Sequence, residues 1–204
     1  MPRLLFAFLF ALSLAVASPA LAGKYNDVLS VGDKAPEFEP LPAVDGTKKS
    51  LADFDAKVLV IVFTCNSCPI AQDYEDRIIA FAEKQPGDVA IVAINPNKVP
   101  TDSLDKMKQR AEEKKFPFVY LQDETQAVAK SFGAYATPEF YVLSPERTIL
   151  YMGAMDDSSV ALKVKKSFLE DAVAAALAGK APETLETYAH GCKIRYEKKR
   201  RTEE

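Results

Sequence analysis

The feature that most constrains the fold of this chain is a run of apolar residues that leads directly into two closely spaced cysteines. Lys57–Phe63 (KVLVIVF) is rich in β-branched residues, which predicts a strand buried on both faces. Pro69–Lys84 then repeats apolar side chains every three or four residues, which predicts a helix. Cys65 and Cys68 therefore lie at a strand-to-helix junction.

The rest of the chain continues this alternation of strands and helices. Asp45-Gly46 is typical of a hairpin turn. Further along, we expect a strand over Asp88–Ile94, a helix capped by Asp102 and running to about Lys115, a strand over Phe118–Leu121, a helix over Thr125–Phe132, a hairpin of Phe140–Leu143 with Thr148–Gly153, and a last helix over Ser159–Ala178. This order predicts an α/β domain with a central, mostly parallel sheet, an antiparallel hairpin, and helices on both faces.

The first residues have the features of a secretory signal peptide. Arg3 provides a positive charge, Leu4–Val16 is almost entirely apolar, and Ala20-Leu21-Ala22 matches the small-residue pattern at which signal peptidase cleaves. We therefore expect residues 1–22 to be a signal peptide cleaved near Ala22, and the mature protein to be periplasmic or secreted.

Length and charge narrow the classes of function. The chain has 204 residues and a formal net charge of −3, which argues against a nucleic-acid-binding surface. We expect one domain over residues 23–180, followed by a C-terminal tail over 181–204 that carries Cys192. The basic run at 198–201 lies in this tail and ends in acidic residues, so a solvated segment is expected there.

The position of the cysteine pair predicts redox chemistry. The N-terminus of a helix favours an anion and lowers the pKa of a thiol placed there. Cys65, on the open side of the turn, is then the better nucleophile, and Cys68 can close a disulfide and release a partner. Asn66 and Ser67 are candidates to cap the helix, and Pro69 suits its first turn.

A metal site or an inert disulfide would account for the cysteine pair less well. A structural zinc site needs four ligands, and only Cys192 and the single histidine, His190, remain to complete one. An inert disulfide between Cys65 and Cys68 would close so small a loop that it would hardly constrain the unfolded chain. We therefore expect no metal.

An odd number of cysteines leaves the role of Cys192 open. The three cysteines either share one disulfide in turn, or leave one that is free, reactive or bonded to another molecule. Cys192 is a candidate resolving thiol, an intermolecular bridge or a free thiol. Thr137-Pro138, directly before a predicted strand, suits either a cis-proline or an ordinary strand-initiating proline.

Several segments together resemble a known family. FTCNSCP (63–69), FPFVYLQDETQAVAKSFGAYATPEFYVL (116–143) and YMGAMDD (151–157), with the entry segment 31–54, resemble the thioredoxin-like redoxins grouped with alkyl hydroperoxide reductase and thiol-specific antioxidant. The resemblance covers about residues 31–178. The variety it is closest to has a CNxCP motif and a late Gly-Cys, here Gly191-Cys192.

The resemblance implies a thioredoxin fold and a thiol–disulfide oxidoreductase. By it, Cys65 attacks, Cys68 resolves, and the redox-active Cys65–Cys68 disulfide replaces any cofactor. Pro138 would be a cis-proline facing the pair, and Thr137 would offer its backbone to an extended substrate beside Asn66 and Ser67. The implied partners are protein or small-molecule thiols and disulfides, with an electron donor in the membrane or periplasm.

Two alternatives stay open beside this interpretation. Peroxiredoxins carry a Pro-x-x-x-Thr-x-x-Cys motif followed by proline; Cys68-Pro69 matches its end, but Cys65 takes the threonine position and Ile61 the first proline position. Pro138 stands where their activating arginine is expected. Sco-type copper chaperones use CxxxC with a histidine inside the domain, whereas this chain has CxxC, and its histidine lies in the tail.

Overall fold

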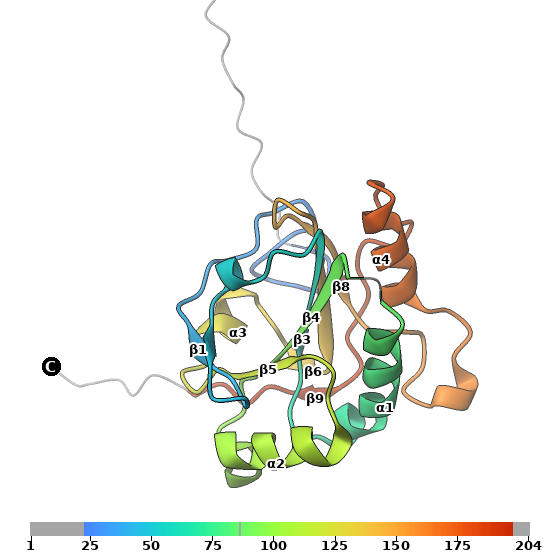
Figure 1. Cartoon of the computed structure of the whole chain (residues 1–204). Coiled ribbons are helices and arrows are strands. Elements are labelled where there is room, and N and C mark those ends of the chain that lie inside the picture. The colour runs from blue at the N-terminus through green and yellow to red at the C-terminus, as the bar shows by residue number, and fades with distance from the viewer. Residues whose placement is uncertain (1–22, 86, 198–204) are drawn as a thin grey trace, which may run out of the picture.

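A computed structural model describes residues 23–85 and 87–197 (Figure 1). The predicted signal peptide, 1–22, and the basic run, 198–201, lie outside the described residues. Within the described ranges, no helix is long and apolar enough to cross a membrane.

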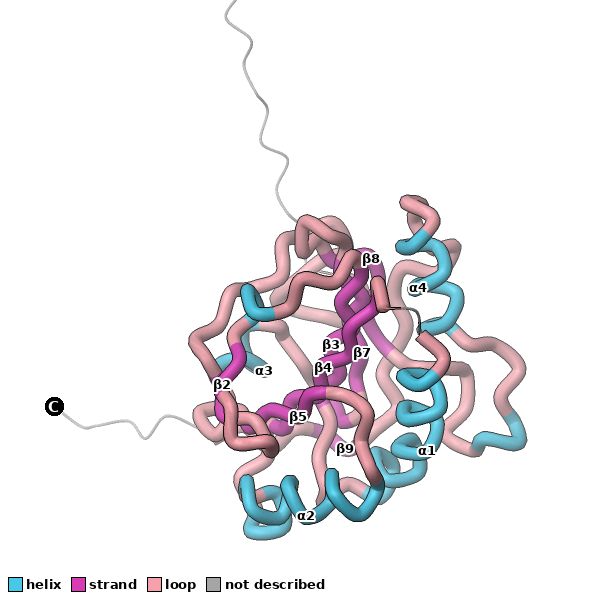
Figure 2. The backbone as a smooth tube through the Cα atoms, viewed as in Figure 1, coloured by secondary structure: helices cyan, strands magenta, loops and turns pink. Residues whose placement is uncertain are grey.

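A mixed five-stranded sheet forms the centre of the molecule (Figure 2). Its order is β5-β4-β3-β7-β8, with parallel pairing from β5 to β3 and antiparallel pairing from β3 to β8. These strands are β3 (Val58–Phe63), β4 (Val89–Asn95), β5 (Val119–Gln122), β7 (Glu139–Leu143) and β8 (Ile149–Gly153). The predicted hairpin at Asp45-Gly46 joins β1 (Leu41–Pro42) to β2 (Lys48–Lys49).

Helices cover both faces of this sheet. The four are α1 (Pro69–Glu83), α2 (Leu104–Lys114), α3 (Ala127–Ser131) and α4 (Phe168–Leu177). Side chains of α1, α2 and α4 pack into the apolar cluster on one face, and those of α3 pack into the cluster on the other. The architecture is the thioredoxin fold that the resemblance implied, and α1 and α3 lie on opposite sides of the sheet in Figure 2.

Strand β3 shows why an unbroken apolar run was needed. Its side chains alternate between the two faces: Val58, Val60 and Val62 enter the cluster with α1 and α4, and the residues between them enter the cluster with α3. All six are at most 1% exposed. Burying each such side chain stabilises the fold by about 1.5–3 kcal/mol, so β3 fixes the position of the cysteine turn at its end.

The expected last helix begins later than the sequence suggested. The prediction began at Ser159, whereas α4 begins at Phe168. The guanidinium of Arg77 donates to the carbonyl oxygens of Ser158 and Ser159, at 3.1 and 2.8 Å, and so takes acceptors that a helix would use. Asp157 also accepts from the Lys165 N–H, so residues 157–165 form a loop that contains only a single 3-10 turn, Ala161–Lys163.

The segment expected to form a tail packs closely on the domain as far as the described residues extend. Its short strand β9 (Cys192–Lys193) pairs antiparallel with β6 (Ala136–Thr137). Ile194 is 7% exposed and belongs to the core cluster around α3. A Cβ on Gly191 would lie 2.2 Å from the Thr137 carbonyl oxygen, so only glycine allows this approach.

Candidate active site

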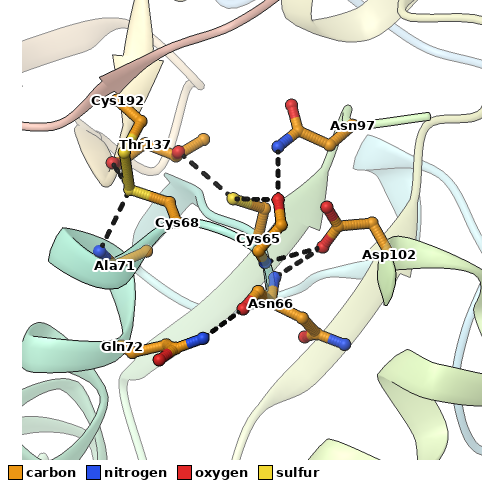
Figure 3. Close-up of a disulfide and its surroundings, with 10 residues drawn as sticks. Cys65, Asn66, Cys68, Ala71, Gln72, Asn97, Asp102, Thr137 and Cys192 are labelled. Carbon is orange, nitrogen blue, oxygen red and sulfur yellow. Dashed lines mark hydrogen bonds between the residues drawn. A yellow bond between two sulfur atoms is a disulfide. The ribbon is translucent and has the colours of Figure 1, made fainter. Parts of the chain in front are cut away.

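The cysteine turn is held between β3 and α1, as the sequence predicted, but the cap of the helix is a cysteine. Cys68 is the N-cap residue of α1, and its sulfur accepts from the Ala71 N–H at 3.4 Å. Pro69 occupies the first helical position. The expected caps, Asn66 and Ser67, lie before the helix (Figure 3).

The disulfide of the structure joins Cys68 to Cys192, whereas the resemblance implied Cys65–Cys68. The two residues are 124 positions apart in sequence, and their Cα atoms are 6.0 Å apart. Pairing of β9 with β6 aligns Cys192 with Thr137 and brings its sulfur to the N-terminus of α1. Cys65 remains a thiol. The structure therefore brings all three predicted cysteines together, with Cys68 at the centre.

Cys65 lies in an unexpected environment. It is 2% exposed, so it does not lie on the open side of the turn. Its sulfur lies 3.3 Å from the Thr137 hydroxyl oxygen, and the Ser67 hydroxyl donates to it at 3.7 Å. Burial raises the pKa of the Cys65 thiol, the Thr137 hydroxyl lowers it, and the charge of Asp102 raises it further. The net direction is opposite to the one expected from the helix N-terminus alone.

Pro138 is a cis-proline, as the resemblance implied. The Thr137 carbonyl oxygen before it lies 3.2 Å from the Cys68 sulfur. The next residue, Glu139, is 5% exposed and fixes the loop by accepting from the N–H groups of Tyr135 and Ala136 at 2.7 and 3.1 Å. Burial raises the pKa of this carboxyl, and those two N–H groups oppose the rise.

The backbone edge at Thr137, where the resemblance implied substrate binding, is occupied by the chain itself. β9 pairs with it, and Gly191 packs against the Thr137 carbonyl.

The three cysteines differ in exposure beside this edge. Cys65 and Cys68 are each 2% exposed, and Cys192 is only partly buried. A hollow of about 450 Å³ opens beside Gly191 and is bordered by Ile70, residues 157–159, Tyr188 and His190.

A buried aspartate that the sequence analysis assigned to a helix cap belongs to the site instead. Asp102 ends a short 3-10 turn (Pro100–Asp102), and Ser103 is the N-cap of α2. One oxygen of the Asp102 carboxylate accepts from the N–H groups of Asn66 and Ser67, at 2.6 and 3.2 Å (Figure 3). One feature of the sequence could have indicated this position. Asp102 follows β4, and because the parallel strands β3 and β4 end at the same edge of the sheet, the segment after β4 comes near the cysteine turn.

The side chains of Asn66 and Ser67, for which a substrate-binding role is predicted, lie in different surroundings. The Asn66 side chain is turned inward: its oxygen accepts from the Tyr120 hydroxyl at 3.1 Å, and its nitrogen donates to the Thr101 carbonyl at 3.0 Å. Ser67 is exposed and accepts from the Asn97 side chain at 3.2 Å. Among the described residues, no group of three or more His, Cys, Asp or Glu side chains is placed to hold a metal ion.

Comparison with known proteins supports the family and the fold. The AhpC/TSA family model matches residues 31–152. A hypothetical protein of Sinorhizobium meliloti has a structure with a TM-score of 0.78 at 31% identity, covering 84% of this chain and 97% of that one. An uncharacterized conserved protein of Geobacillus kaustophilus has a TM-score of 0.76 at 34% identity, covering 84% and 95%.

A curated relative adds a functional name. A Mycobacterium tuberculosis protein named as a peroxiredoxin is 28% identical over 118 residues, which are 55% of this chain and 69% of that protein. The family match spans more than half of the chain and includes the cysteine turn and the cis-proline. The chain is therefore an oxidoreductase of the AhpC/TSA family with a thioredoxin fold.

Proposed function

We propose that this protein is an exported thiol–disulfide oxidoreductase in which three cysteines share one disulfide. The observation that carries the proposal is the Cys68–Cys192 disulfide at the N-terminus of α1, with the Cys65 thiol three residues away on the same turn. Export is supported by the signal-peptide pattern of residues 1–22. A disulfide agrees with export, because disulfides persist outside the cytosol.

Cys68 is the sulfur common to both pairings. An incoming thiolate bonds to the sulfur of Cys192, the least buried of the three cysteines, the Cys68–Cys192 bond breaks, and Cys68 leaves as a thiolate. The Ala71 N–H and the helix N-terminus stabilise that leaving group. A second partner thiol then attacks the mixed disulfide and frees Cys192, so a partner dithiol is oxidised and the protein gains two electrons.

Cys65 provides a second route to the same sulfur. As a thiolate it can attack Cys68, which forms Cys65–Cys68 and releases the Cys192 thiol without any external oxidant. We propose protein or small-molecule thiols and disulfides as substrates, with a membrane or periplasmic electron donor. The redox-active group is then the protein's own disulfide, with no further cofactor.

Disulfide exchange by cysteine variants tests this proposal. We expect Cys68→Ser to abolish reduction of insulin disulfides, because neither pairing can form. Cys65→Ser and Cys192→Ser each keep one pairing and should keep measurable activity. Mass spectrometry of the oxidised proteins should find Cys68–Cys192 in the Cys65→Ser variant and Cys65–Cys68 in the Cys192→Ser variant. Full activity in Cys68→Ser would exclude the proposal.

A peroxidase is the second candidate, favoured by the same disulfide. Cys68-Pro69 matches the end of the peroxiredoxin motif, and a relative carries that name. Attack of the Cys68 thiolate on a hydroperoxide would give sulfenic acid and an alcohol, and the Cys192 thiol would then displace water to form Cys68–Cys192. Peroxide consumption with a thiol reductant, lost in Cys68→Ser and kept in Cys65→Ser, would select this candidate.

A further inference from the structure

A closed ring of buried and partly buried hydrogen bonds lies beside the cysteine turn. Asn95 donates through its side-chain nitrogen to the Asp102 carboxylate at 3.0 Å and to the Tyr120 hydroxyl at 3.1 Å. The Tyr120 hydroxyl donates to the Asn66 side chain at 3.1 Å, and the Asn66 N–H returns to Asp102 at 2.6 Å. The ring joins the end of β4, β5 and the turn after β3, and it fixes the residue directly after Cys65.

The Asp102 carboxylate in this ring is buried, and its two oxygens differ in their hydrogen bonds. Asp102 is fully buried, and all the donors to its carboxylate reach one oxygen, Oδ1. Its Oδ2 is buried without a hydrogen-bond partner among the described residues. A buried carboxylate is costly unless donors or cations compensate it. The turn's own N–H groups therefore supply much of that compensation.

The charged groups around the site do not neutralise Asp102. On α1, Glu75 is engaged by Arg110 of α2, at 2.6 Å. Beside the hollow of about 230 Å³ that borders Asp102, Lys98 pairs with Glu197 at 3.0 Å, and Glu124 adds another negative charge. Across the described ranges, no lysine or arginine lies within salt-bridge distance of Asp102.

Asp102 takes two of the turn's N–H donors, and the Cys68 N–H is the backbone donor that remains to favour the Cys65 thiolate. Backbone N–H groups at a helix N-terminus lower the pKa of a cysteine by stabilising its thiolate. Here Asp102 accepts from the N–H groups of Asn66 and Ser67 and adds a negative charge next to the buried Cys65 thiol. Ionisation of Cys65 would place a second anion in the same buried region.

We propose that Asp102 is a positioning residue that keeps Cys65 a protonated, weakly nucleophilic thiol, because its carboxylate occupies two of the turn's N–H donors and places a negative charge beside the sulfur. Cys65 is then held in reserve while Cys68 and Cys192 carry the disulfide. The raised pKa of the Cys65 thiol, to which burial and Asp102 both contribute, agrees with this role. The consequence of this role for disulfide exchange rests on the proposed function. The effect of Asp102 on the Cys65 thiol can be tested without a substrate.

Alkylation of the oxidised protein tests the proposal, because Cys65 is then the one free cysteine in the described structure. We expect the rate of reaction with iodoacetamide to rise with pH, with a midpoint above the ordinary thiol value of about 8.5. Asp102→Asn should lower this midpoint by about one pH unit and speed alkylation at pH 7.5 about threefold or more. Asparagine has the same shape as aspartate, and its side-chain oxygen can replace Oδ1 as the acceptor of the N–H groups.

Two matched variants separate charge from shape. Asp105→Asn removes the same charge from the exposed start of α2, and should leave the midpoint unchanged. Tyr120→Phe opens the ring but keeps the carboxylate, and should move the midpoint much less than Asp102→Asn. An unchanged or raised midpoint in Asp102→Asn, or an equal fall in Tyr120→Phe, would overturn the proposal.

The wild-type profile decides the question if Asp102→Asn does not fold. A Cys65 midpoint below the ordinary thiol value would itself refute the proposal. Because alkylation needs no partner protein, this test can succeed while insulin reduction fails, and the two proposals can be judged separately.

Discussion

Cys65 and Cys68 lie three residues apart on one turn, yet the rest of the chain gives them opposite surroundings. Cys68 caps α1, accepts from the Ala71 N–H and is bonded to Cys192. Cys65 is buried beside the Thr137 hydroxyl, and the charge of Asp102 opposes its ionisation. A CxxC spacing brings two thiols together, whereas segments far away in the sequence decide the surroundings of each.

The largest expected difference between the surroundings of Cys68 and those of Cys65 is in their contribution to stability. Cys68–Cys192 crosslinks positions 124 residues apart, and a loop of that size stabilises a protein by about 4–5 kcal/mol if the loss of chain entropy on unfolding accounts for the effect. We therefore expect Cys192→Ser to lower the free energy of unfolding of the oxidised protein by about that amount. A Cys65–Cys68 disulfide, formed in its place, closes too small a loop to compensate. Urea unfolding of both oxidised proteins measures the loss.

Cys65→Ser is the control for this experiment. It keeps Cys68–Cys192, so its free energy of unfolding should stay within about 1 kcal/mol of wild type. Equal losses of unfolding free energy in Cys192→Ser and Cys65→Ser would show that the Cys68–Cys192 disulfide is not the cause of the lower stability.

The next largest expected effect on stability comes from the close contact between Gly191 and the cis-proline loop. An alanine Cβ there would lie 2.2 Å from the Thr137 carbonyl oxygen and 2.5 Å from its carbon, both backbone atoms that cannot turn away. Gly191→Ala should destabilise the protein by about 1–3 kcal/mol. It should also slow closure of Cys68–Cys192, because β9 can no longer lie flat against β6.

Gly87→Ala is the matched control, since a Cβ at that position would have no neighbour within 4 Å. Thermal unfolding and the rate of disulfide closure after reduction should both match wild type in this variant. A Gly191→Ala protein as stable as Gly87→Ala would mean that β9 is loosely held and that Cys192 reaches Cys68 by chance encounter.

Local pattern was enough to predict most of the sheet and its main helix. The predicted strand Lys57–Phe63 and helix Pro69–Lys84 differ from β3 and α1 by one residue at one end each. Unbroken apolar runs and a three-to-four-residue repeat are properties of contiguous residues, so they survive in the sequence. The cis form of Pro138 came from the family resemblance, because its position alone suited either isomer.

What the sequence did not reveal depends on contacts between distant residues. Arg77 takes the carbonyls of Ser158 and Ser159, so the last helix starts later than its composition suggests. Cys192 pairs with Cys68 because β9 adds to β6, and a two-residue strand leaves no periodic signal. Asp102 looked like a helix cap, since aspartate before a helical segment usually is one.

The smallest predicted effect concerns the hydroxyl that favours ionisation of Cys65. The Thr137 oxygen lies 3.3 Å from the Cys65 sulfur and lowers the pKa of the thiol, opposite in sign to the effect of Asp102. Thr137→Val keeps the side-chain shape and removes this contact, so the pKa of Cys65 should rise further and the thiolate fraction at pH 8 should fall. We expect alkylation of Cys65 at pH 8 to slow about two- to fivefold. Thr101→Val, at an exposed position near the turn, should leave the rate unchanged. Thr137→Val and Asp102→Asn should shift the pKa of the same thiol in opposite directions, so an unchanged or faster rate in Thr137→Val would show that the Thr137 hydroxyl does not favour the Cys65 thiolate.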